Sequence, residues 1–130
     1  MDITSRTYGD VVVVEPAGRI DYPAGAEFER SLLALTNPSA GADAGLVVDM
    51  QGVTYIGSVG LRVLLVAAKA LHARAVRIAV ANVQPTVREI MAIAHFETVV
   101  EIFPTLNDAI GALSSNALAA YRAANEGRSP

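Results

Sequence analysis

The stretch over residues 46–71 constrains the fold more than any other part of the chain. It opens with LVVDM, which is apolar except for one acid and is typical of a strand covered on both faces. A turn-rich link follows, QGVTYIGSVG, and then LRVLLVAAKAL, whose apolar residues recur at helical spacing. A buried strand that leads through a short link into a helix predicts an α/β domain.

The rest of the chain continues the alternation of strands and helices. Further strands are predicted over 3–8, 11–14, 76–80 and 99–103, and helices over 23–36, 59–73, 82–94 and 105–117. Helices of crossover length between strands favour parallel pairing, whereas a turn at Gly9-Asp10 favours an antiparallel N-terminal hairpin. We therefore expect one α/β domain over 1–115, with a mixed, mostly parallel sheet of four to five strands and helices packed mainly on one side. Residues 116–130 are expected to form a helical extension that frays from Glu126 onward.

Composition excludes several classes of function. The 130 residues carry a net charge of −3, which does not resemble the basic footprint of a nucleic-acid binder. Cys is absent, which removes disulfides, thiolate catalysis and cysteine metal sites. No signal peptide and no run of about 18 apolar residues is present, so we expect a cytoplasmic domain that does not enter a membrane. Four basic residues are expected on a solvated face: Arg62, Lys69, Arg74 and Arg77.

The candidate functional residue is Ser58, which lies between two glycines where the link meets the helix. A serine here is either a plain helix N-cap or an exposed hydroxyl available for modification. No histidine or carboxylate partner can be named for it, so we expect no catalytic residue. His72 and His95 lie in separate segments and make a poor metal site, and Asp49 is expected to order a turn.

The segment VDMQGVTYIGSVGL over 48–61 resembles the signature of the STAS domain. That family includes bacterial anti-sigma factor antagonists and the cytoplasmic domains of sulphate transporters. Gly18-Arg19-Ile20-Asp21 is similar to a second element of the family pattern. The order of strands and helices also agrees, and the resemblance covers residues 3–114.

The resemblance implies a partner-switching role in which Ser58 is the phosphoacceptor. The unphosphorylated domain would bind a serine-kinase anti-sigma factor, phosphorylation would release it, and a cognate phosphatase would restore binding. Asp21 would contribute to the partner face, although capping of the helix at Pro23 explains it equally well. A monomer or weak homodimer without metal or cofactor is expected. The expected partner-binding residues are Asp21, Gly57, Ser58, Val59, Gly60 and Arg62.

Two positions depart from the family pattern. Gly57 stands where the family has an acid, and Val59 stands where it has a small polar residue. These departures favour an alternative in which the domain is not phosphorylated. It would then be a scaffold, or a regulatory subunit of a transporter or multiprotein complex.

Overall fold

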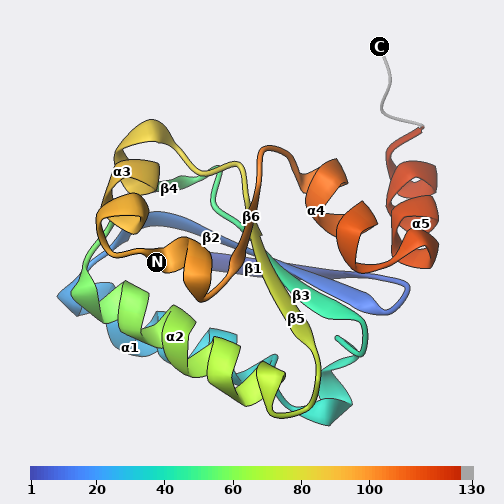
Figure 1. Cartoon of the computed structure of the whole chain (residues 1–130), viewed down its shortest axis with the longest axis horizontal. Helices are drawn as coiled ribbons and strands as arrows, with labels where there is room; N and C mark the ends of the chain where they lie inside the picture. The colour runs from blue at the N-terminus through green and yellow to red at the C-terminus, as the bar shows by residue number, and fades with distance from the viewer. Residues whose placement is uncertain (127–130) are drawn as a thin grey trace.

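The computed structural model describes residues 1–126 and contains a six-stranded mixed sheet flanked by helices (Figure 1). The strand order is β1-β2-β3-β5-β6, and β4 pairs with β2 beside this path. Most of the predicted frayed end, 127–130, lies outside the described residues. The strands are β1 (Asp2–Tyr8), β2 (Val11–Ile20), β3 (Gly45–Asp49), β4 (Val53–Ile56), β5 (Arg77–Ala81) and β6 (Glu101–Phe103). The helices are α1 (Tyr22–Ala34), α2 (Ser58–His72), α3 (Pro85–Ile93), α4 (Leu106–Leu113) and α5 (Ser115–Glu126), with short 3-10 turns at Pro38–Ala40 and Phe96–Thr98.

The predicted N-terminal hairpin is confirmed. β1 and β2 pair antiparallel, with Tyr8 opposite Val11, and Gly9 between them has a φ of +57°. The other pairings, β2 with β3 and β4, β3 with β5, and β5 with β6, are all parallel. Helices lie between β2 and β3, between β4 and β5, and between β5 and β6, so the chain can return in the same direction for each of these strands, whereas β4 follows β3 directly.

Strand β2 pairs with two parallel neighbours, one along its first part and the other along its last part, and this feature was not predicted. Its first part, from Val11 to Val14, pairs with β3, and its last part, from Gly18 to Ile20, pairs with β4. A bulge separates the two parts where Gly18 has a φ of +98° and donates its N–H to the Gly52 carbonyl at 2.8 Å. β4 is thus a sixth strand in a segment that the sequence had indicated to be a link.

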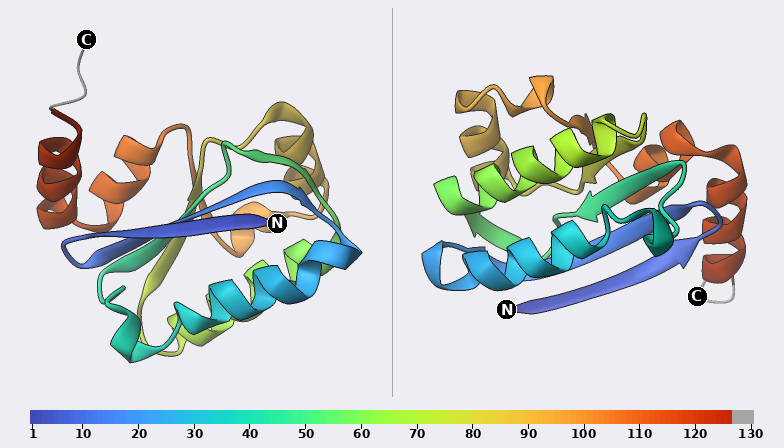
Figure 2. Two further views of the ribbon diagram at one scale, coloured as in Figure 1. Left: turned by 180° about the vertical axis from the view of Figure 1, so that it is seen from behind. Right: turned by 90° about the horizontal axis from the view of Figure 1, so that it is seen from below.

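The sheet carries helices on both faces. In Figure 1, α1 and α2 lie below the sheet, whereas α4 and α5 lie above it, and Figure 2 shows the same layers from behind and from below. The larger core cluster joins α1, α2 and α3 to alternate strand residues such as Leu46 and Val48. The smaller cluster joins α4 and α5 to the intervening residues, such as Val47. The expectation of helices mainly on one side therefore describes α1–α3, while α4 and α5 cover part of the opposite face.

The predicted C-terminal helix is interrupted at Ser114. Thr105 caps α4 as the sequence predicted, accepting the Asp108 N–H at 3.1 Å. Ser114 is extended, and its hydroxyl donates to Asp10 Oδ1 at 2.7 Å and accepts the Ala117 N–H at 3.1 Å. This joint turns α5 back onto the β1–β2 hairpin, where the rings of Tyr8 and Tyr121 meet edge to face with centroids 5.2 Å apart.

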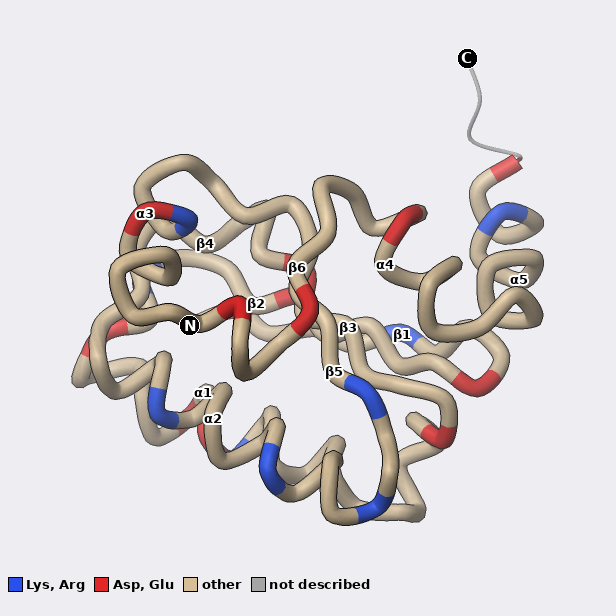
Figure 3. The backbone as a smooth tube through the Cα atoms, in the orientation of Figure 1, with Lys and Arg blue, Asp and Glu red and all other residues tan. Residues whose placement is uncertain are grey.

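The predicted solvated basic face is only partly present. Arg62 and Lys69 are exposed on α2, along which Figure 3 shows basic positions in blue. Arg74 instead donates to the Thr36 carbonyl, and Arg77 bonds to both Glu101 and the carbonyl of Ala112. Arg77 is still exposed, as predicted. The prediction was wrong for Arg74, which is half-buried because tertiary folding brings the Thr36 carbonyl to it. Over residues 1–126, no helix has both the length and the hydrophobicity needed to cross a bilayer.

Candidate functional site

Parallel pairing of β2 with β4 builds the site around Ser58. Ile20 lies opposite Ile56 at the ends of the two strands, and the Gly57 N–H donates to the Ile20 carbonyl at 2.9 Å. Parallel strands end at the same edge of a sheet, so the residues that follow these partners, Asp21 and Gly57, emerge together. The structure thus unites the two sequence elements that carry the STAS resemblance.

Ser58 is the first residue of α2 and does not cap it. The N-cap position belongs to Gly57, with φ −94° and ψ −178°, and Gly57 has no side chain to bond to the first turn. The interpretation of Ser58 as a plain N-cap was therefore wrong by one residue. Ser58 is exposed, and its hydroxyl has no hydrogen bond to the residues described. The start of α2 presents a hydroxyl and uncapped backbone N–H groups at one point.

Asp21 lies at the N-cap position of α1 but makes no side-chain capping bond. Its carboxylate instead lies 3.4 Å from Arg19 Nε. The Arg19 guanidinium lies over the Tyr55 ring, 4.3 Å from its centroid. The capping alternative for Asp21 is thus confirmed for its position, but not for a side-chain capping bond. Sequence reasoning gave Arg19 and Tyr55 no role, because their contact depends on the unpredicted pairing of β2 with β4.

The glycines at the junction differ in what surrounds them. A Cβ at Gly60 would lie 2.6 Å from Ile56 Cγ1 and 2.7 Å from Ile20 Cγ2, so glycine is required for the close approach of α2 to the sheet. A Cβ at Gly57 would meet Tyr55 Cε2 at 3.5 Å, which is an ordinary contact. Gly60 is buried and Gly57 is half-buried. Gly60 therefore supports the site from below, whereas position 57 has room for a larger residue.

A surface groove of about 380 Å³ lies between the first turns of α1 and α2. Val59 is half-buried and packs closely against Gly25 of α1 within it, so Val59 is less open to solvent than the sequence had indicated. Arg62 lines the same groove, one turn after Ser58. Tyr22, which sequence reasoning missed, is 85% exposed here and is an available aromatic anchor.

The turn-ordering role predicted for Asp49 is confirmed. Asp49 is only 8% exposed. Its Oδ1 accepts hydrogen bonds from the Gln51 N–H and from the Asn82 side-chain amide, each at 3.1 Å. The two histidines are exposed, as expected. In the part of the chain that the structure describes, no group of three or more potential metal ligands comes together.

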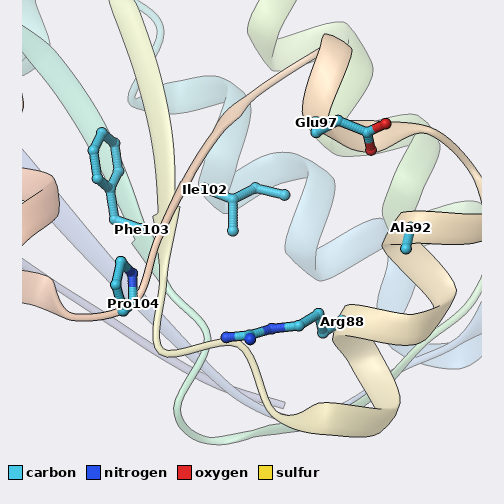
Figure 4. Close-up of a pocket in the computed structure, with 6 residues that line it drawn as sticks. All are labelled: Arg88, Ala92, Glu97, Ile102, Phe103 and Pro104. Carbon is cyan, nitrogen blue, oxygen red and sulfur yellow. The ribbon is translucent and has the colours of Figure 1, made fainter.

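A second pocket of about 340 Å³ lies between α3 and β6, away from the predicted residues. Figure 4 shows the side chains of Arg88 and Ile102 extending into the space between these two elements. The lining combines apolar groups with one base and one acid, Arg88 and Glu97. These six lining residues supply no nucleophile beside a general base, so the pocket offers no catalytic arrangement.

Comparison with known proteins agrees with this geometry. The family model described as the STAS domain matches residues 2–109. The fold is similar to an anti-sigma factor antagonist from Mycobacterium paratuberculosis, with 25% identity, a TM-score of 0.77, and 86% of this chain and 92% of that chain covered. It is also similar to the Bacillus cell fate determinant SpoIIAA in its phosphorylated form (18% identity, TM-score 0.66, coverage 87% and 100%).

The same fold occurs in a larger protein of a different kind. The murine Solute Carrier 26 family member A9 anion transporter matches with 18% identity and a TM-score of 0.73, over 85% of this chain and 19% of the transporter. Among curated proteins, none matches this sequence. The family model spans most of the chain and includes both β2 and the Ser58 junction. The chain belongs to the STAS domain family.

Proposed function

We propose that this chain is a non-catalytic signalling module that binds a serine-kinase anti-sigma factor in the cytoplasm and is released when Ser58 is phosphorylated. A cognate phosphatase restores the binding form. The observation that carries the proposal is the exposed Ser58 hydroxyl at the start of α2, beside Asp21 and an open groove. The similarity to an anti-sigma factor antagonist supports the same role.

The start of α2 suits a phosphate on Ser58. Phosphorylation adds about −1.5 to −2 charges at pH 7. The uncapped N–H groups and the positive end of the helix dipole favour a negative group there by about 0.3–1 kcal/mol. Arg62 is exposed one turn further along and adds a positive charge within the same helical face. The isolated domain therefore tolerates the modification.

A docked partner would not tolerate it. The kinase would cover Ser58 together with Asp21, Tyr22 and the groove that Arg62 lines. Burying a dianionic group in that interface carries a large desolvation cost, and Asp21 would repel it. The proposed switch thus has little effect on the fold and a large effect on the complex.

The alternative is a domain that binds a partner without being phosphorylated, as a scaffold or a regulatory subunit. Gly57 favours it, because the chain has no carboxylate immediately before Ser58. Val59 also favours it, because its side chain packs on Gly25 and makes the surface beside the hydroxyl apolar. Both hypotheses use the same face for binding a partner, so phosphorylation of Ser58 is the property that distinguishes them.

Incubation with the cognate kinase and ATP, followed by intact-protein mass spectrometry, tests the proposal. We expect one phosphate on the native chain and none on Ser58→Ala. Ser115→Ala is a matched control, because Ser115 is also an exposed serine at the first position of a helix. A kinase that binds the domain yet adds no phosphate would favour the scaffold, and loss of phosphate in Ser115→Ala would place the site on α5.

A Ser58→Glu variant tests the asymmetry of the switch. We expect kinase binding to weaken at least about tenfold, which corresponds to 1.4 kcal/mol. The melting temperature should stay within about 2 °C, because the new charge lies at a favourable helix end. Calorimetric titration and thermal unfolding measure the two quantities. A large loss of stability with unchanged binding would show that the hydroxyl is structural.

A further inference from the structure

Strand β1 forms one edge of the sheet and has no strand on its outer side among residues 1–126. Figure 2 shows β1 at the margin of the sheet, with β2 on its inner side. The strand is seven residues long and pairs with β2 without a bulge, whereas β6 at the opposite edge has only three residues. β1 also lacks the proline and lysine that natural proteins use to keep edge strands from pairing. This edge is therefore open to a further strand.

The hairpin determines which backbone groups of β1 point outward. In a two-residue hairpin the flanking pair, here Tyr8 and Val11, exchanges hydrogen bonds, and such pairs alternate along the ladder. Ile3 then falls in a pair without hydrogen bonds, which agrees with its partner, Pro16, having no N–H to donate. The N–H and C=O groups of Ile3 and Ser5 consequently point away from β2.

Two charged side chains of β1 are free to bind another molecule. Asp2 and Arg6 are exposed, and neither forms an ion pair with residues 1–126. Side chains two residues apart share a face of a strand, so both lie on the same face as Thr4, midway between them. The arrangement is self-complementary. When a second β1 runs antiparallel with the two Thr4 residues facing each other, Asp2 of each copy lies opposite Arg6 of the other.

The hydrogen bonds and the charges select the same register. With the two Thr4 residues facing, Ile3 of each copy lies opposite Ser5 of the other, and both residues direct their backbone groups outward. The threonine pair and the two pairs of Asp2 with Arg6 then lie at positions without hydrogen bonds, where side chains are closest. Threonine pairs and opposite charges both stabilise adjacent strands. A shift by one residue would break the hydrogen-bond pattern, and a shift by two would separate the charges.

We propose that β1 pairs antiparallel with β1 of a second copy of this chain, with Thr4 at the two-fold axis, and so forms a homodimer with one continuous sheet. The contact is isologous, because the same strand serves both subunits. One pair of strands buries less than about 1,200 Å², so the dimer belongs to the weak, reversible class. The pairing uses none of the residues of the proposed Ser58 face, and each dimer carries two such faces.

Oxidative cross-linking of single-cysteine variants tests the register, because the native chain has no cysteine. Thr4→Cys places two thiols directly opposite each other, with Cα atoms about 4.5 Å apart, a separation that a disulfide can bridge. Ser5→Cys is the matched control, because its two copies would lie more than about 7 Å apart. We expect Thr4→Cys to form the disulfide dimer at least about tenfold faster than Ser5→Cys. Equal rates, or a faster reaction of Ser5→Cys, would overturn the proposed register.

Sedimentation velocity of the full chain, from about 10 μM to about 1 mM, tests the role of the charges. Arg6→Asp should weaken dimerisation at least about tenfold, because the symmetry places like charges opposite each other twice. The double variant Asp2→Arg with Arg6→Asp exchanges the charges and should restore dimerisation to within about threefold of the native chain. Arg88→Asp is the matched control. It makes the same change of charge at an exposed position of α3 and should dimerise as the native chain does.

Three sedimentation results would overturn the proposal. The first is a native chain that stays monomeric up to about 1 mM. The second is an equal loss in Arg6→Asp and Arg88→Asp, which would mean that net charge alone governs association. The third is a double variant that dimerises no better than Arg6→Asp. Thermal unfolding checks the fold of each variant. The melting temperatures should agree within about 2 °C, because Asp2 and Arg6 make no ion pair within residues 1–126.

Discussion

Two helices in this protein begin at an exposed serine, and their first turns are satisfied in different ways. At α5, Ser114 precedes Ser115, accepts the Ala117 N–H and donates to Asp10 of the hairpin. At α2, the residue before Ser58 is Gly57, which has no side chain to perform either task. The start of α5 is a structural joint, whereas the start of α2 keeps its donors and its hydroxyl available for another group.

The packing that holds α2 in place also differs from the packing that holds the α4–α5 unit. α2 is held by the close approach of Gly60 to Ile20 and Ile56, below the surface that carries Ser58. The α4–α5 unit is held by polar bonds at Ser114 and by looser contacts such as Gly111 facing Leu118. A surface can gain charge without destabilising the fold when the contacts that hold its helix in place lie outside that surface. The start of α2 meets this condition.

The largest effect is expected from Gly60→Ala, which attacks the support of α2. The added methyl group has no space between Ile20 and Ile56, so we expect a loss of about 2 kcal/mol in the free energy of unfolding. The comparison variant is Gly111→Ala, whose methyl group would meet the flexible end of Leu118 at 3.0 Å. There the gain in helix propensity, up to about 1 kcal/mol, offsets the crowding. Urea denaturation measures both, and equal losses would refute the distinction.

A smaller effect is expected from Ser114→Ala, which removes the side-chain cap of α5. Helix α2 has no such cap. Loss of the bonds to Ala117 and Asp10 should cost about 1 kcal/mol. Ser58→Ala should change stability by less than about 0.5 kcal/mol, because the exposed Ser58 hydroxyl makes no hydrogen bond to the described residues. Thermal unfolding of the pair is the measurement. A cost for Ser58→Ala as great as that for Ser114→Ala would mean that both serines are structural.

Low pH should destabilise the part of the protein around α4 and α5, because it weakens one ion pair there. The hydrogen bond from Arg77 lowers the pKa of Glu101 below its usual 4.5, and burial opposes this only in part. A carboxyl group whose pKa is lower in the folded state stabilises the protein at pH values above its unfolded-state pKa. This stabilisation is lost as the pH falls through the folded-state pKa. Because both side chains are more than 40% exposed, the contribution should stay below about 1 kcal/mol. Stability measured from pH 6 to pH 3 should fall less steeply in Glu101→Gln, and identical slopes would contradict the role of this pair.

The smallest effect is expected from Gly57→Asp, which gives α2 the capping group that it lacks. Position 57 has an ordinary backbone and space for a Cβ, so the substitution should stabilise by a few tenths of a kcal/mol. It would also restore the acid that the STAS pattern has before the serine. We expect faster phosphorylation of Ser58 by the cognate kinase, measured by initial rates. A slower rate would indicate that Gly57 is adapted to this chain's own kinase.

Sequence periodicity predicted β3 and α2 because each is long and its pattern is local. It missed β4, whose four residues lie between glycines and resemble a link. That omission also hid the contact between Arg19 and Tyr55 and the adjacency of Asp21 to Gly57. The helix after Thr105 was predicted as continuous because its apolar spacing persists through Ser114, and only the bond to Asp10, 104 residues away, turns the chain there.

The sequence by itself determined the α/β class, the N-terminal hairpin, the STAS resemblance and the position of Ser58 near a helix start. These follow from periodicity and short motifs, which depend on neighbouring residues alone. The tertiary structure decided that Gly57, not Ser58, occupies the cap position and that Gly60 supports the site. Each of these depends on strand register, which is set when residues far apart in the chain pack together and which no local pattern encodes.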